Sequence, residues 1–190
     1  MGSGKPRATR RQSPKSSTQE ECFLPLTQGE KASATRLLLE DPRLASMAKV
    51  GRYQVISAEP WIKKSKQKKG SRSAKILVFN YASNKTLHAF IDLQEGKIVK
   101  LVQDGSQPML SPEEECRATK IALLDQRVST EISGNQKPLA VLQYWSSKES
   151  DLSYNQRSAA LVFGDKGPTL VAIVNLNSAS VIDVVPNHKW

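Results

Sequence analysis

The strongest candidate for binding another molecule is a run of positive charge in the first half of the chain. Between residues 61 and 72 six side chains are basic and none is acidic: Lys63, Lys64, Lys66, Lys68, Lys69 and Arg72. Such a segment attracts phosphates or carboxylates, with an affinity that falls as the salt concentration rises. It would serve equally as a solvated hairpin tip whose charges keep a sheet edge from pairing with other molecules. The sequence leaves these two interpretations open.

Few residues are suited to catalysis. The chain has two histidines, His88 and His188, and two cysteines, Cys22 and Cys116. A nucleophilic site needs a base beside the nucleophile and a third group that orients the base, and only a tertiary coincidence would join His88 to Cys116. We expect Cys116 to be a buried or half-buried helix residue. Three glutamates at 113–115 suit a helix N-terminus better than a catalytic carboxylate pair. We therefore expect no catalytic residue, metal or cofactor.

The remaining excess charge lies in the first residues. The formal charge is +10, of which residues 1–19 supply five positive charges and residues 61–72 supply six, so the rest sums to −1. Residues 1–19 lack the apolar stretch of a secretory signal, and no apolar run is long enough to span a bilayer. We expect residues 1–21 to be a disordered basic tail and the protein to be intracellular, in the cytoplasm.

The chain repeats itself. Residues 26–30 (Leu-Thr-Gln-Gly-Glu) recur 84 positions later as residues 110–114 (Leu-Ser-Pro-Glu-Glu). Two more matches follow at nearly the same offset: residues 72–74 with 157–159, and residues 89–93 with 172–176. A repeat this long indicates two copies of one folding unit. We place the first copy at residues 22–106 and the second at residues 107–190.

The two copies differ most in one loop. The counterpart of the basic run is residues 147–156, which contain Lys148, Glu149 and Asp151 and are not basic. Copies that share their core positions but differ in a loop have diverged at the surface. This difference indicates that the loop of the first copy is the binding element.

Each copy is predicted to be a helix followed by four strands. Thr27 with Glu30, and Ser111 with Glu114, fit the capping box that begins a helix. Asp41 before Pro42 should interrupt the first helix and start a short second turn. Segments enriched in Val, Ile, Leu, Phe and Tyr, with turn residues between them, then predict strands at 53–62, 74–81, 86–93 and 97–103, and at 139–146, 158–163, 170–176 and 180–185. The fold class is α+β, each copy being one helix packed on a four-stranded antiparallel meander.

The spacing of several residues also resembles a known family. The residues are those of 87–99, followed by the segment 107–111 and by Glu114, Ala118, Ile121, Asp125 and Val128. They resemble the paired N-terminal domains, called N2 and N3, of copper amine oxidases, and the resemblance covers about residues 22–186. It implies that each copy has a cystatin-like shape. In that family a β-sandwich catalytic domain follows, which here would lie beyond Trp190.

The catalytic residues of that family have no counterparts here. The family holds copper in a cage of three histidines, which two isolated histidines cannot reproduce. Its quinone is made from a tyrosine in an Asn-Tyr-acidic context, and Asn80-Tyr81-Ala82 lacks the acidic residue. We therefore expect Tyr81 to be a packing or sheet-edge residue.

Our leading hypothesis is a non-catalytic binding or assembly protein made of two N2/N3-like domains. The basic loop and tail would contact an acidic protein partner. One alternative is a small-molecule-binding or enzymatic protein with a pocket between helix and sheet, and another is an accessory part of a copper amine oxidase. Nonspecific nucleic-acid binding by the basic segments is a third hypothesis. Homo-oligomerisation stays open.

Overall fold

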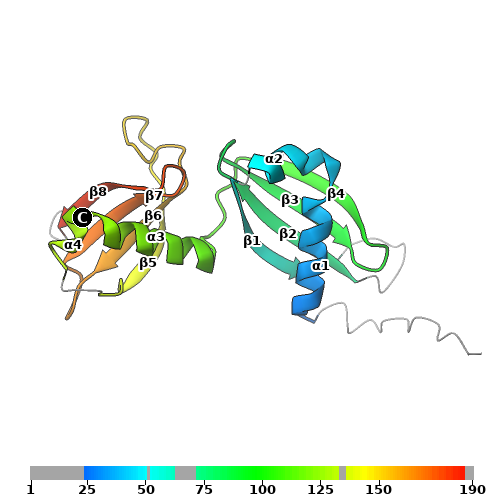
Figure 1. Cartoon of the computed structure of the whole chain (residues 1–190), viewed down its shortest axis with the longest axis horizontal. Helices are drawn as coiled ribbons and strands as arrows, with labels where there is room; N and C mark the ends of the chain where they lie inside the picture. The colour runs from blue at the N-terminus through cyan, green and yellow to red at the C-terminus, as the bar shows by residue number, and fades with distance from the viewer. Residues whose placement is uncertain (1–23, 51, 63–71, 133–135, 187–190) are drawn as a thin grey trace, which may run out of the picture.

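The computed structural model describes residues 24–50, 52–62, 72–132 and 136–186. These residues form two α+β units, each with a four-stranded antiparallel sheet covered on one face by a helix. The two units lie next to each other along the long axis of the molecule, with α1 across the first sheet and α3 across the second (Figure 1).

The order of elements is the same in both units. The first unit contains α1 (Gln28–Leu39), the 3₁₀ helix η2 (Pro42–Leu44), α2 (Ala45–Val50), β1 (Tyr53–Pro60), β2 (Ser73–Asn80), β3 (Lys85–Asp92) and β4 (Lys97–Asp104). The second contains α3 (Pro112–Leu124), α4 (Gln126–Ser129), β5 (Ala140–Tyr144), β6 (Ser158–Phe163), β7 (Leu170–Asn175) and β8 (Ser180–Pro186). The sheets run β1-β2-β3-β4 and β5-β6-β7-β8. The predicted strands are confirmed to within two residues at each end.

Matching local signals begin both long helices. The Thr27 hydroxyl accepts a hydrogen bond from the Glu30 N–H at 3.2 Å, and the Glu30 carboxylate accepts from the Thr27 N–H at 2.7 Å. Ser111 and Glu114 repeat this box at 3.2 and 2.9 Å. The predicted interruption at Asp41 is also confirmed, because its side chain caps the 3₁₀ turn by accepting from the Arg43 N–H at 2.9 Å.

The repeat is also visible in the pairing of the strands. The register shifts between Phe90 and Ile91 where β3 pairs with β4, and between Ile173 and Val174 where β7 pairs with β8. These two irregularities are 83 residues apart, so the same distortion occurs at the same place in both sheets. Bulges of this kind persist as designed features of a fold. The two units are therefore alike in topology and in the pairing of their last two strands, whereas β1 and β2 have a further register shift, between Val55 and Ser57, that β5 and β6 lack.

Each unit has a core between its long helix and the covered face of its sheet. In the first unit Ala34 and Leu38 of α1 are fully buried against Ile76, Val78 and Ile91. In the second unit Ala118 and Ala122 of α3 are likewise fully buried in the core. Truncating Leu38 to alanine would cost about 2–5 kcal/mol, and the small alanines of both helices let the helix backbone lie close to its sheet.

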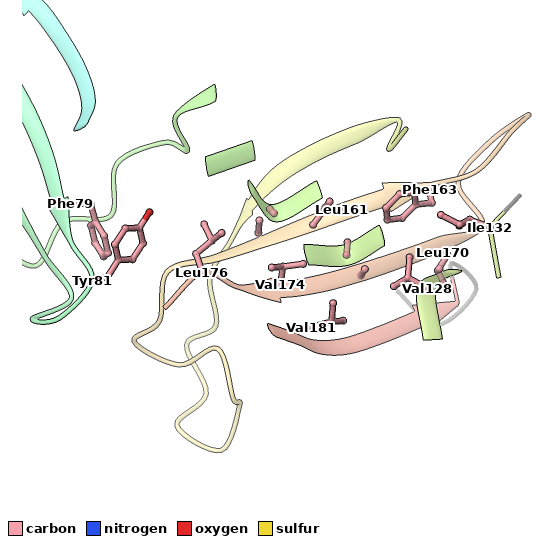
Figure 2. Close-up of a cluster of buried hydrophobic side chains, with 14 residues drawn as sticks. Phe79, Tyr81, Val128, Ile132, Leu161, Phe163, Leu170, Val174, Leu176 and Val181 are labelled. Carbon is pink, nitrogen blue, oxygen red and sulfur yellow. The ribbon is translucent and has the colours of Figure 1, made fainter. Parts of the chain in front are cut away.

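Two aromatic residues of the first unit belong to the core of the second. Phe79 and Tyr81, at the end of β2, are 0% and 6% exposed and cluster with buried residues of the second unit. Figure 2 shows them on the first unit, facing Leu176 of the second. The two units are thus joined through packed side chains and not only through the connecting chain.

Among the residues that the structure describes, every helix is too short or too polar to cross a lipid bilayer.

Candidate functional site

The lysines of the predicted basic surface lie outside the described residues. These are Lys63, Lys64, Lys66, Lys68 and Lys69. The structure describes the two ends of their loop, where the Trp61 N–H donates to the Ser73 carbonyl at 2.9 Å. The run therefore connects β1 to β2, as the sequence predicts, and its role in binding stays a prediction.

Arg72, the sixth residue of the run, forms an intramolecular clamp. Its Nε donates to the Glu30 Oε1 at 2.8 Å, and its Nη1 and Nη2 donate to the carbonyls of Leu24 and Pro25 at 2.7 and 2.9 Å. Its side chain is only 12% exposed. Arg72 thus holds the chain before α1 against the start of β2, and the lysines of the run are left as the candidates for an external partner.

The second unit contains the same clamp in a completely buried form. Arg157 donates through Nε to the Glu114 Oε1 at 3.0 Å and through Nη2 to Oε2 at 2.7 Å. It also donates to the carbonyls of Pro108 and Met109, the counterparts of Leu24 and Pro25. Both side chains of the ion pair are 0% exposed.

The first unit buries the clamp of the second. The Phe79 ring centroid lies 4.9 Å from the Arg157 guanidinium carbon, and the Tyr81 hydroxyl donates to the Glu114 Oε1 at 2.5 Å. The guanidinium of Arg117 lies 4.7 Å from the Tyr81 ring centroid. Asn177 adds a hydrogen bond from its Nδ2 to the Tyr81 carbonyl at 3.0 Å. We call Phe79, Tyr81, Glu114 and Arg157 the junction.

The electrostatics of the junction are those of a satisfied ion pair. Burial raises the pKa of Glu114, but hydrogen bonds from Arg157 and Tyr81 outweigh burial and hold the pKa below its ordinary value. Burial, followed by the hydrogen bond to Glu114, raises the pKa of Tyr81. These shifts favour an ionised Glu114 and a neutral Tyr81, as expected of a buried ion pair whose charges are compensated. Tyr81 is the packing residue that the sequence predicts.

The sequence predicted Glu114 as a helix-start residue and missed its partner. A signal was present, because the repeat carries Glu30 onto Glu114 and Arg72 onto Arg157. Opposite charges that recur together at one offset are typical of a pair in contact. Neither local composition nor spacing indicated that the second pair is buried.

Among the described residues, His88 has a carboxylate and a hydroxyl beside it, but not in the arrangement of a catalytic triad. The Nε2 of His88 lies 3.1 Å from the Asp104 Oδ2 and 3.4 Å from the Ser106 Oγ. In a catalytic triad the carboxylate and the hydroxyl contact opposite ring nitrogens, whereas here both contact the same one. Cys22 and His188 lie outside the described residues.

The expectation for Cys116 is wrong. Its thiol is free and exposed, although the residue lies in α3 as predicted. The buried residues of α3 are Glu114, Ala118 and Ala122, which recur every four positions along one face. Cys116 falls between them in sequence, so its side chain projects from the opposite face of the helix.

Two hollows in the second unit are candidates for holding a ligand. One, of about 470 Å³, lies where the second helix segment meets the sheet and is lined by Arg127, Thr130, Glu131, Thr169, Leu170, Val184 and Pro186. The other, of about 300 Å³, lies beside the helix-free face of the sheet and is lined by Tyr144, Asp151, Leu152, Ile173, Ile182 and Asp183. Within the described ranges, no three His, Cys, Asp or Glu side chains gather as a metal site would require.

No model of a known protein family matches this chain, and no curated protein matches it.

Proposed function

We propose that the chain is a non-catalytic binding or assembly protein built from two cystatin-like modules similar to the N2 and N3 domains of copper amine oxidases. The five lysines of the loop between β1 and β2, together with the basic tail, contact an acidic protein partner. Arg72 is left out of this surface because Glu30 and two carbonyls already hold it.

The observation that carries the proposal is the unequal charge of two matched loops. Both loops connect the first two strands of a sheet, and both sheets have the same strand order. The loop of the first unit gathers five lysines, whereas residues 147–156 mix one lysine with two acids. A shared fold does not require this difference, so we attribute it to a partner of the first loop.

A comparison of the binding of two charge variants tests the proposal. In one variant the five loop lysines become glutamine. The matched control removes the same charge from exposed lysines elsewhere: Lys49, Lys85, Lys120, Lys137 and Lys166. The probes are poly-L-glutamate, single-stranded RNA and duplex DNA, each measured by fluorescence anisotropy at several salt concentrations.

We expect the wild-type protein and the control to bind poly-L-glutamate, and the loop variant to lose at least tenfold in affinity. Equal loss in both variants would show that only net charge matters and would overturn the proposal. Tighter binding of RNA or DNA than of poly-L-glutamate at matched salt would favour nonspecific nucleic-acid binding instead.

The hollow of about 470 Å³ supports a second candidate function, small-molecule binding between helix and sheet. Its volume falls in the range of natural ligand pockets. Native mass spectrometry of the purified protein tests this candidate. A stoichiometric small ligand that is lost on Arg127→Ala would favour small-molecule binding. A spectrum that shows only the mass of the protein without a ligand would count against it.

A further inference from the structure

The helix-free faces of the two sheets differ at one matched position. In the first unit the rings of Trp61 and Phe90 lie 4.7 Å apart, and the Lys100 ammonium lies 5.7 Å from the Phe90 ring centroid. Phe90 and Lys100 are direct partners in the pairing of β3 with β4. The first unit therefore places its own cation beside an aromatic surface.

The repeat identifies the same position in the second unit. An offset of 83 residues carries Phe90 onto Ile173 and Lys100 onto Asp183, and these two are again direct partners, in the pairing of β7 with β8. Tyr144 takes the place of Trp61, because each lies opposite a matched serine at the start of the next strand, Ser158 and Ser73 respectively. At this position the second unit has a carboxylate where the first has an ammonium group.

The space around Asp183 is hollowed. The smaller hollow, of about 300 Å³, has a floor of Ile173 and Ile182, an aliphatic wall in Leu152 and a phenol in Tyr144. The carboxylates of Asp151 and Asp183 complete the lining, and no basic residue belongs to it within the described part of the chain.

Both carboxylates are held in place by the protein. Asp151 Oδ1 accepts from the Ser153 N–H at 2.8 Å and from the Ser153 hydroxyl, while the Tyr144 hydroxyl lies 3.4 Å from Oδ2. Asp183 Oδ1 accepts from the Val184 N–H at 2.8 Å. Groups that are fixed before binding lose little freedom when a ligand arrives.

The nearby guanidinium of Arg127 is already engaged. It pairs with Asp125 at 2.8 Å and donates to the Val181 carbonyl at 2.7 Å. Arg127 lines the larger hollow and not the one beside Asp183. The lining of the smaller hollow therefore contributes no cation of its own, although the charge of Arg127 also acts on Asp183.

We propose that the smaller hollow binds an alkyl-ammonium group, supplied either by a free amine or by a lysine side chain of a partner. The ammonium group lies between Asp151 and Asp183, and the alkyl chain packs on Ile173, Ile182 and Leu152. The ligand thus supplies to the second unit the ammonium group that Lys100 supplies beside Phe90 in the first. The aliphatic floor favours an organic cation over a hydrated metal ion, which prefers to be surrounded by oxygen.

This inference goes beyond the proposed function, because it concerns another unit and a partner of opposite charge. The two can fail separately. Replacing the five loop lysines by glutamine should leave ammonium binding unchanged, and changing Asp183 should leave the binding of poly-L-glutamate unchanged.

A titration of the full chain followed by two-dimensional NMR tests the proposal. The probes are n-butylammonium chloride and N-acetyl-lysine-N′-methylamide, and the controls are n-butanol, sodium chloride and calcium chloride. We expect saturable shifts at Asp151, Ser153 and Ile173 with a dissociation constant on the order of 1–10 mM, as befits so small a ligand. Tighter binding of the lysine derivative would identify a lysine side chain as the source of the ammonium group. Tighter binding of butylammonium would identify a free amine as the source.

Variants locate the site. Asp183→Asn should weaken butylammonium binding at least tenfold, and Asp183→Lys, which introduces the residue of the first unit, should abolish it. The matched control is Asp165→Asn, an exposed acid in the turn after β6 that should bind as the wild type does. If Asp183→Asn disturbs the fold, Leu152→Ala should still weaken binding about threefold, because Leu152 is 72% exposed and its truncation leaves the core intact.

Three outcomes would overturn the proposal. The first is the same affinity in Asp183→Asn and Asp165→Asn. The second is equal shifts with butylammonium, butanol or sodium chloride, which would show that the ammonium group is not recognised. The third is displacement of butylammonium by calcium at equal concentration, which would identify a cation site of another class.

Discussion

The same clamp, an arginine that binds a glutamate and two carbonyls, has two different environments in this molecule. Arg72 and Arg157 each hold a capping-box glutamate and two carbonyls of the chain before the helix. Arg72 and Glu30 remain partly exposed, at 12% and 27% of their side chains, whereas Arg157 and Glu114 are 0% exposed. Solvent can therefore compensate for the loss of one partner in the first clamp but not in the second.

Arg157→Met should destabilise the protein by about 3–5 kcal/mol, because it leaves the Glu114 carboxylate buried without its counter-charge. Arg72→Met should cost less, about 1–3 kcal/mol, because water can reach Glu30. Urea unfolding followed by circular dichroism gives both values. Equal losses would show that burial does not govern the strength of the clamp.

The clamp of the first unit also predicts how stability depends on pH. The hydrogen bond from Arg72 is the main cause that lowers the pKa of Glu30 from 4.5 to about 2. As the pH falls below 4.5 the unfolded chain takes up this proton before the folded protein does. The contribution of Glu30 is therefore present above pH 4.5 and is lost as the pH falls toward 2.

Glu30→Gln should accordingly be less stable than the wild type at pH 6, and its stability should decline less steeply between pH 4.5 and 3. Urea midpoints measured across this range check the slope. Asp41→Asn removes another carboxyl whose pKa is lowered, chiefly by the hydrogen bond from Arg43, and should flatten the slope as well, but at lower pH, between 3.8 and about 2. If the stability of Glu30→Gln fell with pH as steeply as that of the wild type, Glu30 would not be the group responsible for this pH dependence.

At the scale of elements, the helix starts are the features that local sequence determines most directly. Thr27→Ala and Ser111→Ala each remove one capping hydrogen bond, which is worth about 1 kcal/mol. Ser111→Ala should cost more, because Ser111 is 1% exposed whereas Thr27 lies at the surface. Thermal unfolding of the two variants measures the difference. A larger loss in Thr27→Ala would mean that burial of the cap is unimportant.

The sequence predicted these elements well because their signals are local. A capping box spans four residues, and a strand is indicated by enrichment in Val, Ile, Leu, Phe and Tyr over five to eight residues between turns. The short turns between the strands, such as residues 83–85 and 94–96, indicated antiparallel hairpins and hence the order of the strands, and the repeat indicated that both copies share it. Elements such as β2 and β6 were therefore predictable without any knowledge of distant contacts.

It was harder to predict which face of each element is buried and which distant residues meet. Cys116 was expected to be at least half-buried and is exposed, because the apolar pattern of α3 rests on small alanines and gives a weak direction. The hollow beside Asp183 joins a residue of β8 to Asp151 in a loop more than thirty positions earlier. Nothing in local composition indicates that such residues meet, because their contact depends on how the loop lies on the sheet.

At the scale of the whole molecule, the junction decides whether the two units behave as one. The ring of Phe79 covers Arg157, and the hydroxyl of Tyr81 reaches Glu114, so the second unit reaches its full burial only against the first. Arg52 reinforces the contact by donating to the Asn177 carbonyl at 2.9 Å. We expect cooperative unfolding of the two units as a consequence.

Phe79→Ala should separate the unfolding of the two units, because it admits water to the buried ion pair and removes the packing between them. The chain has three tryptophans. Trp61 reports on the first unit and Trp145 on the second, so variants in which Trp190 and one of these two are replaced allow fluorescence to follow each unit alone. The two urea transitions should coincide in the wild type and differ in Phe79→Ala. Phe163→Ala, a fully buried ring inside the second unit, should lower both transitions together because the junction is intact. Coincident transitions in Phe79→Ala would place the coupling elsewhere, in the chain that connects β4 to α3.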